Sequence, residues 1–140
     1  MRLGSSDSFT CEMSGRLFAL SVKKGYDSVD FVDKLMHSEL AQHLYKKEQS
    51  PMWLGEAYLM STLETECTIK QGPTYDIDMM EWAGWLFKYW SIAYPDDTPL
   101  NIYTQAPIQK LNNMHIGLHV MSPDIQIQDI KELFSQSLLS

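Results

Sequence analysis

Apolar residues recur at helical spacing along the first third of the chain. They fill about every third or fourth position of Phe9–Lys24, and Gly25 follows where a helix commonly ends. Asp27 or Ser28 can then cap a second apolar series, and Ser38 restarts it. The pattern predicts a first helix, followed by one broken helix or two short ones.

Serine–proline pairs mark two later helix starts. Ser50 precedes Pro51 and Ser122 precedes Pro123. Serine accepts hydrogen bonds from the free N–H groups of a helix start, and proline, which lacks an N–H, fits the first helical position. Asp76 can act as a cap in the same way. These signals and the apolar spacing predict helices over Met52–Cys67, Ile77–Tyr94, Pro107–Met121 and the segment after Pro123.

No segment alternates polar and apolar residues for long enough to predict a strand. Leu100–Thr104 comes nearest, and it is short. No repeat and no Gly-, Ser- or Pro-rich linker divides the chain. We therefore predict an all-α, single-domain bundle of about five to seven helices around a Trp-rich helix at residues 76–94. Residues 1–8 are expected to form a flexible lead, and residues 9–140 the helical domain.

The Trp-rich helix is apolar around most of its circumference. With about 100° per residue, apolar side chains cover about 240° of it. The narrow polar arc contains Ser91, Gly84, Lys88 and Glu81. A helix of this kind packs on several sides, so its aromatic side chains are expected in the core. Alternatively, some of Trp85, Tyr89 and Trp90 stay partly exposed and anchor a partner, because Trp and Tyr dominate binding hot spots.

Glu56 is the most unusual residue of this pattern. A helix over Met52–Cys67 places it in the middle of an apolar stripe that contains Leu59, Met52, Leu63, Cys67, Met60 and Trp53. A carboxylate there is costly unless it is paired or hydrogen-bonded. Lys88, a Tyr hydroxyl or a His could satisfy it structurally. Alternatively, the stripe faces a groove where Glu56 meets a ligand or partner.

Charge narrows the class of partner. The formal net charge is -7, and residues 48–140 carry 4 basic and 12 acidic side chains. Arg2 and Arg16 are the only arginines, whereas nucleic-acid binding depends on many Lys and Arg side chains, so nucleic acid is not an expected partner. An acidic surface suits a basic protein partner, although it also serves ordinary solubility.

The cysteines and the beginning of the sequence predict a cytoplasmic protein. Cys11 and Cys67 lie far apart with no CxxC motif, which favours reduced thiols over a disulfide or zinc site. The first residues lack the apolar run of a signal peptide, and no segment approaches the roughly 20 apolar residues of a membrane span. We expect no association with membranes.

Chemical motifs are scarce. His115 and His119 share one helix face and are weak candidates for metal binding, but no Glu separates them as in HExxH and no CxxC accompanies them. The sequence contains no Gly-rich phosphate loop and no GxSxG elbow. It therefore predicts no cofactor and gives no positive support for an enzyme.

Several sequence runs resemble a group of small bacterial all-α proteins encoded in toxin-antitoxin-like or mobile-element loci. The runs are Met52–Leu59, Leu63–Glu66, Met80–Trp90 and Leu118–Pro123, together with Tyr75 and Asp76. The matching positions are Trp53, Gly55, Glu56, Tyr58, Glu81, Trp82, Gly84 and Trp90. The resemblance attaches no role to them, and this chain departs from the pattern at Trp85 and Lys88, where the group is expected to have Tyr and Arg.

Two functions follow as hypotheses. The first is a protein-interaction module, an antitoxin or immunity-type component that neutralises a basic, toxin-like protein from a neighbouring gene. The second is a small-molecule-binding or enzymatic site centred on Glu56, with Lys88, His115 or Tyr58 nearby. The candidate binding residues are Glu56, Trp53, Tyr58, Glu81, Trp85, Lys88, Tyr89 and Trp90.

Overall fold

The computed structural model describes residues 3–46 and 54–139, which form eight helices. The predicted all-α bundle is confirmed, with more helices than the expected five to seven. In chain order the helices are α1 (Ser5–Lys23), α2 (Ser28–Met36), α3 (Glu39–Leu44), α4 (Glu56–Glu66), α5 (Ile77–Ala93), α6 (Pro99–Gln105), α7 (Ile108–Leu118) and α8 (Pro123–Leu139). In the described part of the chain, the one β-bridge joins Tyr26 to Gln71.

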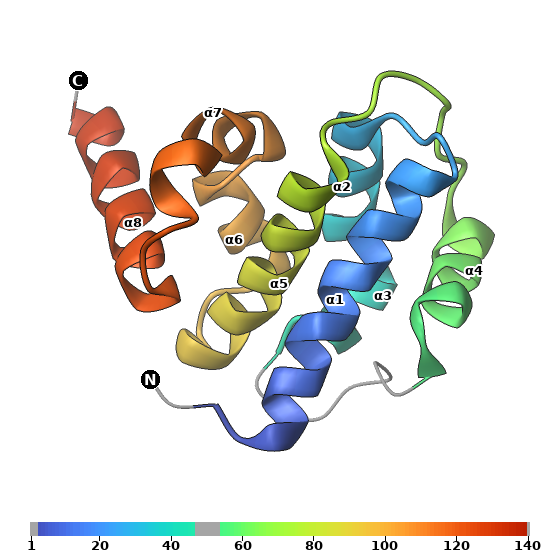
Figure 1. The fold of residues 1–140 in the computed structure, drawn as a ribbon, viewed down its shortest axis with the longest axis horizontal. Coiled ribbons are helices and arrows are strands. Elements are labelled where there is room, and N and C mark those ends of the chain that lie inside the picture. Colours follow the sequence, from blue (N-terminus) through green and yellow to red (C-terminus); the bar gives the residue numbers. More distant parts are fainter. Residues whose placement is uncertain (1–2, 47–53, 140) are drawn as a thin grey trace.

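Helix α5 runs through the middle of the molecule, as its all-round apolar surface predicts (Figure 1). α1 lies beside it in the opposite direction, and α4 covers the far side of α1. α2 and α3 lie behind this pair, while α6, α7 and α8 occupy the other side of α5. A single core of buried side chains extends from α1 to α8.

Two glycines allow α1 and α5 to approach each other closely. A Cβ atom at Gly84 would lie 2.6 Å from the backbone oxygen of Ser14, and one at Gly15 would lie 2.9 Å from that of Glu81. Real Cβ atoms do not come so near to a backbone oxygen. Gly84 therefore belongs to the contact between the two helices and not to a solvent-exposed polar arc.

Aromatic rings fill the space beside this contact. Phe18 of α1 meets Phe31 of α2 and Phe87 of α5 edge to face, with ring centroids 5.3 and 5.8 Å apart. Such edge-to-face pairs are favoured because the positive edge of one ring meets the negative face of the other. The pairs join three helices around one point in the core.

Capping side chains fix several helix starts where the sequence predicts them. Asp27 accepts a hydrogen bond from the Asp30 N–H, and Ser38 accepts one from Ala41, so α2 and α3 are two separate short helices. Asp76 caps α5 through the N–H groups of Asp78 and Met79. These are the local interactions that the sequence analysis expects.

Other boundaries differ from the prediction. α1 begins at Ser5 and not at Phe9, so part of the expected lead is helical. α4 begins at Glu56 and not at Met52, because Gly55 adopts a φ of 88°, outside the helical region. Ser50, Pro51 and Trp53 lie outside the described residues. The segment Leu100–Thr104, the nearest to a predicted strand, lies within helix α6, whose start carries a capping box from Thr98.

Candidate functional site

Glu56 lies at the N-terminal end of the buried face of α4. It occupies the first turn of α4 and is half-buried, while the buried positions of that helix are Leu59, Met60 and Leu63. The predicted helix start was wrong by four residues, and Met52 and Trp53 of the predicted stripe lie outside the described residues. Glu56 lines a hollow of about 270 Å³ with Arg16, Ala19, Leu20, Lys23 and Glu81. No ion pair within the described chain joins these charged side chains.

Lys88 binds the C-terminal end of α3 and does not pair with Glu56. Its ammonium group is buried and donates hydrogen bonds to the backbone oxygens of Leu44, at 2.7 Å, and Lys46, at 2.8 Å. Both oxygens lie at the C-terminal end of α3, where the helix dipole favours a positive charge. Lys88 is therefore a capping group for a neighbouring helix.

The three aromatic candidates on α5 differ in how deeply they are buried. Trp90 is fully buried and donates from Nε1 to Asp97 at 2.8 Å. Tyr89 is also buried and donates to Asp124 at 2.7 Å. Trp85 is only half-buried and stacks on Tyr89, with ring centroids 5.2 Å apart. Of the three proposed anchor residues, Trp85 alone is open to a partner.

The remaining candidates are spread over the molecule. Tyr58 and Glu81 are exposed on α4 and α5, whereas Trp53 lies outside the described residues. Lys88, Tyr58 and His115, the expected neighbours of Glu56, are not among the residues that line its hollow. Among the described candidates, Glu56 and Glu81 therefore share a hollow, and the candidates as a whole do not form one site.

His115 and His119 share a face of α7, as their spacing predicts. Their ring centroids are 4.7 Å apart, and Trp82 packs against His115 at 4.9 Å. Burial, with a smaller contribution from His119, lowers the pKa of His115. Among the described residues, no group of three or more His, Cys, Asp or Glu side chains is placed to hold a metal ion.

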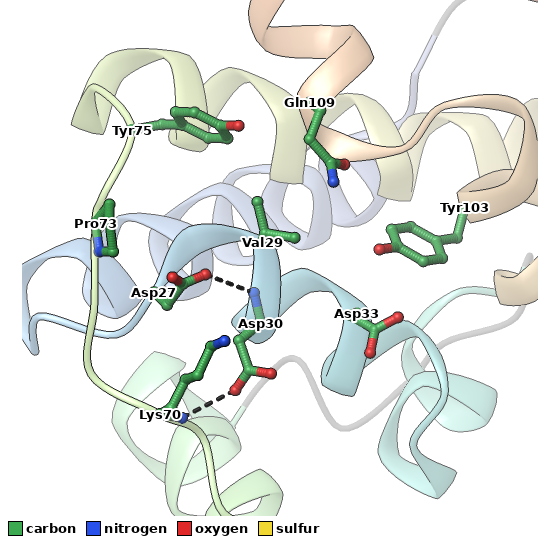
Figure 2. Close-up of a pocket in the computed structure, with 9 residues that line it drawn as sticks. All are labelled: Asp27, Val29, Asp30, Asp33, Lys70, Pro73, Tyr75, Tyr103 and Gln109. Carbon is green, nitrogen blue, oxygen red and sulfur yellow. Dashed lines mark hydrogen bonds between the residues drawn. The ribbon is translucent and has the colours of Figure 1, made fainter.

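A hollow with an acidic lining follows α2 (Figure 2). It has a volume of about 490 Å³ and lies between α2, the segment 70–75, α6 and the start of α7. Its lining residues are Asp27, Val29, Asp30, Asp33, Lys70, Pro73, Tyr75, Tyr103 and Gln109. We call this the α2 groove. It combines carboxylates, two phenol rings and an amide.

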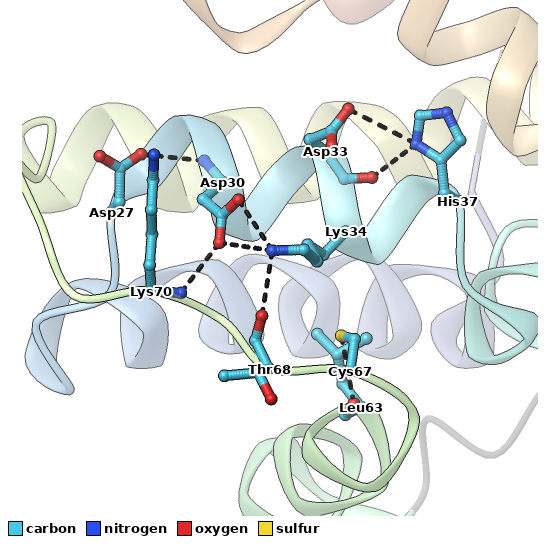
Figure 3. A network of polar contacts seen from close by, with 9 residues as sticks. All are labelled: Asp27, Asp30, Asp33, Lys34, His37, Leu63, Cys67, Thr68 and Lys70. Carbon is cyan, nitrogen blue, oxygen red and sulfur yellow. Dashed lines mark hydrogen bonds and ion pairs between the residues drawn. The ribbon is translucent and has the colours of Figure 1, made fainter.

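The floor of the α2 groove is held by Asp30 (Figure 3). Its carboxylate accepts two hydrogen bonds from Lys34, at 2.8 and 2.9 Å, and one from the Lys70 backbone N–H at 2.9 Å. Lys34 also donates to the backbone oxygen of Thr68 at 3.0 Å. Burial would raise the pKa of Asp30, but the bonds from Lys34 and Lys70 lower it overall. Asp30 is therefore a structural carboxylate that fixes the segment after α4 onto α2.

Asp33 is the more open acceptor of the α2 groove. About half of its side chain is exposed, and its Oδ1 lies 3.5 Å from Nδ1 of His37. Tyr103 forms the wall beside it, and burial together with the nearby Asp33 charge raises the pKa of Tyr103 to about 12. Tyr103 therefore keeps its proton at neutral pH. The pair offers a carboxylate and an aromatic ring to a cationic group.

The sequence contains a signal for this groove that the sequence analysis did not use. Asp27, Asp30 and Asp33 are three residues apart, which places them on one side of a helix. The local pattern predicts Asp27 only as a helix cap. Tyr75, Tyr103 and Gln109 come from distant segments, and no local pattern brings them to α2.

The two cysteines are poor nucleophiles. Cys11 is buried, and that burial raises the pKa of its thiol to about 12. Cys67 is half-buried, and its pKa is also raised by burial. Because a thiolate is the reactive form, neither position supplies an activated nucleophile.

None of the described helices has both the length and the apolar character needed to cross a bilayer. Comparison of the chain with known protein families, with curated proteins and with solved structures gave no match.

Proposed function

We propose that this chain is a protein-interaction module that binds a basic protein partner through the α2 groove. The observation that carries the proposal is the lining of the α2 groove, where Asp33 stands beside Tyr103 in a hollow of about 490 Å³. A Lys or Arg side chain fits a site of this kind, because a carboxylate pairs with its charge and an aromatic face attracts it.

The charges around the α2 groove favour one cationic group rather than many. Lys34 neutralises the negative charge of Asp30 in an ion pair, and the helix dipole at the N-terminus of α2 partly compensates the negative charge of Asp27. Lys70 also lines the groove. Asp33 is then the carboxylate left for an incoming cation, which makes it the residue to test.

Within this proposal, the biological role is that of an antitoxin or immunity-type component in the bacterial cytoplasm. Its support is the resemblance to the proteins of toxin-antitoxin-like loci and the net charge of -7, which suits a basic, toxin-like partner. Electrostatic attraction of this kind speeds association and makes binding sensitive to salt.

Co-expression with the product of the neighbouring gene tests the proposal. We expect the two proteins to purify together and the chain to restore the growth of cells that produce the partner. Asp33→Asn should weaken the complex about tenfold, as expected for a charged contact at an interface. Glu12→Gln, an exposed acid on α1, is the matched control. If the proteins neither purify together nor restore growth, the proposal is wrong.

A second candidate function rests on the hollow around Glu56. Arg16 and Lys23 face it from α1, and Glu56 and Glu81 line it from α4 and α5. Two cationic and two anionic side chains suit a small zwitterion such as an amino acid, with each end bound by the opposite charge. The volume of about 270 Å³ accommodates a molecule of that size.

Thermal-shift screening with free amino acids tests this second function. A ligand that binds there should raise the melting temperature of the wild-type chain, and Glu56→Gln should abolish the rise. Glu39→Gln, which removes a charge on α3, should not change it. If no free amino acid shifts the melting temperature, the hollow is not an amino-acid site.

A further inference from the structure

A second groove lies between the last two helices. It has a volume of about 390 Å³, and its lining residues are Met114 and Leu118 of α7 with Asp129, Glu132, Leu133 and Gln136 of α8. We call it the α7–α8 groove. The four α8 residues are spaced at i, i+3, i+4 and i+7, so they form one row along that helix.

Exposed apolar side chains are most frequent in the part of the chain that forms this groove. Of ten large apolar side chains that are exposed in the described part of the chain, seven belong to residues 116–139. They are Ile116, Val120, Met121, Ile125, Leu133, Leu138 and Leu139. One of them, Leu133, lines the groove, where it adds exposed apolar surface that a partner can cover.

The walls of the α7–α8 groove are fixed before any partner arrives. The Gln126 side chain is buried and donates from Nε2 to the backbone oxygens of Leu118 and Met121, both at 2.8 Å. These oxygens lie at the end of α7 and just after it, so Gln126 both caps α7 and joins it to α8. A preformed groove spares a partner the cost of ordering it.

The charges of the α7–α8 groove are all negative. Asp129 and Glu132 line it, and no ion pair joins either of them to another described residue. The two nearby lysines are engaged elsewhere: Lys131 binds Asp97 at 2.7 Å, and Lys110 donates to the Gln105 backbone oxygen at 3.3 Å. The α7–α8 groove therefore presents an apolar floor with two unneutralised carboxylates.

We infer that the α7–α8 groove binds an amphipathic helix of a protein partner, one with an apolar face and a flank of Lys or Arg side chains. The apolar face would cover Met114 and Leu133, and the basic flank would meet Asp129 and Glu132. Binding of an amphipathic helix in a groove is a recurrent mode of peptide recognition. The inference rests on the proposed function, since it names the kind of segment that a basic partner inserts.

A second copy of this chain is a poorer occupant. In a symmetric dimer the same surface patch of each copy is used, so the groove would bring Asp129 and Glu132 of both copies together. Like charges at an interface cost binding energy, whereas a basic helix neutralises them.

Two synthetic peptides of about four helical turns test the inference. Both carry Leu on one face, and the other positions are Lys in the first peptide and Glu in the second. Fluorescence anisotropy should show that the full chain binds the Lys peptide and not the Glu peptide. Leu133→Ser, and separately Asp129→Asn with Glu132→Gln, should each weaken binding about tenfold or more.

Matched variants separate the groove from general charge attraction. Ile116→Ser alters an apolar residue that is 85% exposed outside the groove, and Glu12→Gln with Glu39→Gln removes two charges on α1 and α3. Neither should change the affinity more than about twofold. Equal losses in the groove and control variants, equal binding of both peptides, or no binding of the Lys peptide would each overturn the inference.

Two further outcomes keep the inference distinct from the proposed function. If Asp33→Asn and not the groove variants weakens the Lys peptide, the inference fails while binding at the α2 groove stands. If the wild-type chain is a dimer in sedimentation and Leu133→Ser dissociates it, the groove is a self-contact and the inference is overturned. Failure of the natural partner to bind at all would instead count against the proposed function.

Discussion

Glycine has two different roles in the helices of this protein. Gly84 lies where α5 meets α1, and a Cβ there would meet the Ser14 backbone oxygen at 2.6 Å and the Phe18 ring at 2.8 Å. Gly117 lies in α7, and a Cβ there would meet nothing within 4 Å. The residue type is the same, but only one of the two positions requires it.

Alanine substitution should therefore have opposite effects at these two positions. Gly84→Ala should destabilise the fold by about 3 kcal/mol, because the atoms in its way include backbone that cannot turn aside. Gly117→Ala should stabilise it by up to about 1 kcal/mol, since alanine loses less conformational freedom in a helix. Urea denaturation measures both. Equal effects of the two substitutions would show that the α1–α5 contact does not depend on glycine.

At the scale of elements, α3 is the clearest case of a helix stabilised by its neighbours. It has only six residues, too few for a stable isolated helix. The Glu66 carboxylate of α4 accepts the N–H groups of Glu39 and Leu40 at its start, at 2.8 and 3.0 Å. Lys88 of α5 binds the oxygens at its end. Each charge has the sign that the helix dipole favours.

Removing the cap at either end of α3 should destabilise the protein. Glu66→Ala should cost about 1 kcal/mol, the usual worth of a helix cap. Lys88→Met should cost about 2 to 3 kcal/mol, because it leaves buried backbone oxygens unsatisfied. Both substitutions should lower the urea concentration at the unfolding midpoint and leave unchanged the slope of the unfolding free energy against urea concentration. Glu12→Ala, on the exposed face of α1, is the control and should change stability by less than about 0.5 kcal/mol.

These contacts explain which features the sequence could reveal. Asp27, Ser38 and Asp76 act on residues two or three positions away, so local reasoning placed their helices well. Lys88 binds residues more than 40 positions away, and the helical period of the sequence does not predict such a distant contact. The start of α4 was misplaced for a related reason, since the helical period alone does not show that Gly55 leaves the helix. The α2 groove needs Tyr103 and Asp33 together, which only the tertiary fold provides.

A polar cluster around Asp97 joins α5, α6 and α8. Its carboxylate accepts hydrogen bonds from Lys131 at 2.7 Å and from Trp90 Nε1 at 2.8 Å. Lys131 also lies over the Trp90 and Tyr94 rings, 5.2 and 4.6 Å from their centroids. Burial would raise the pKa of Asp97, but these hydrogen bonds and the Lys131 charge lower it overall.

The lowered pKa of Asp97 predicts acid sensitivity. A carboxylate with a lower pKa in the folded state stabilises the fold above its unfolded pKa of about 3.9, and the contribution is lost as the pH falls through the folded value. Thermal melts should therefore show a loss of stability below about pH 4. Asp97→Asn should be less stable at pH 7 and lose less on acidification. An unchanged pH profile in that variant would assign the acid sensitivity to other carboxylates.

For the whole molecule, burial is unequal between its middle and its edge. α5 buries eleven of its residues, whereas α8, at the periphery, buries Gln126, Ile127 and Ile130 (Figure 1). The Gln126 side chain also donates hydrogen bonds to backbone oxygens at the end of α7. These hydrogen bonds hold α7 and α8 together in addition to the chain that connects them. Elements with few buried contacts open at a lower free energy than the core.

Amide hydrogen exchange should therefore show α8 opening before α1 and α5. Ile127→Val, which removes one buried methylene group at a cost of about 1 kcal/mol, should lower the protection of α8 and α5 amides alike about fivefold, because both openings lose the Ile127 contacts. Ile92→Val makes the same change on α5 and should lower the protection of α5 amides only, because Ile92 stays packed when α8 opens and α5 amides exchange only when the whole molecule unfolds. Equal protection of α8 and α5 in the wild-type chain would contradict this and make the eight helices one cooperative unit. If α8 does open separately, the α7–α8 groove lies on the least stable edge of the fold, and a bound partner helix should raise the protection of α8 and α5 amides by the same factor, because neither opened state binds it.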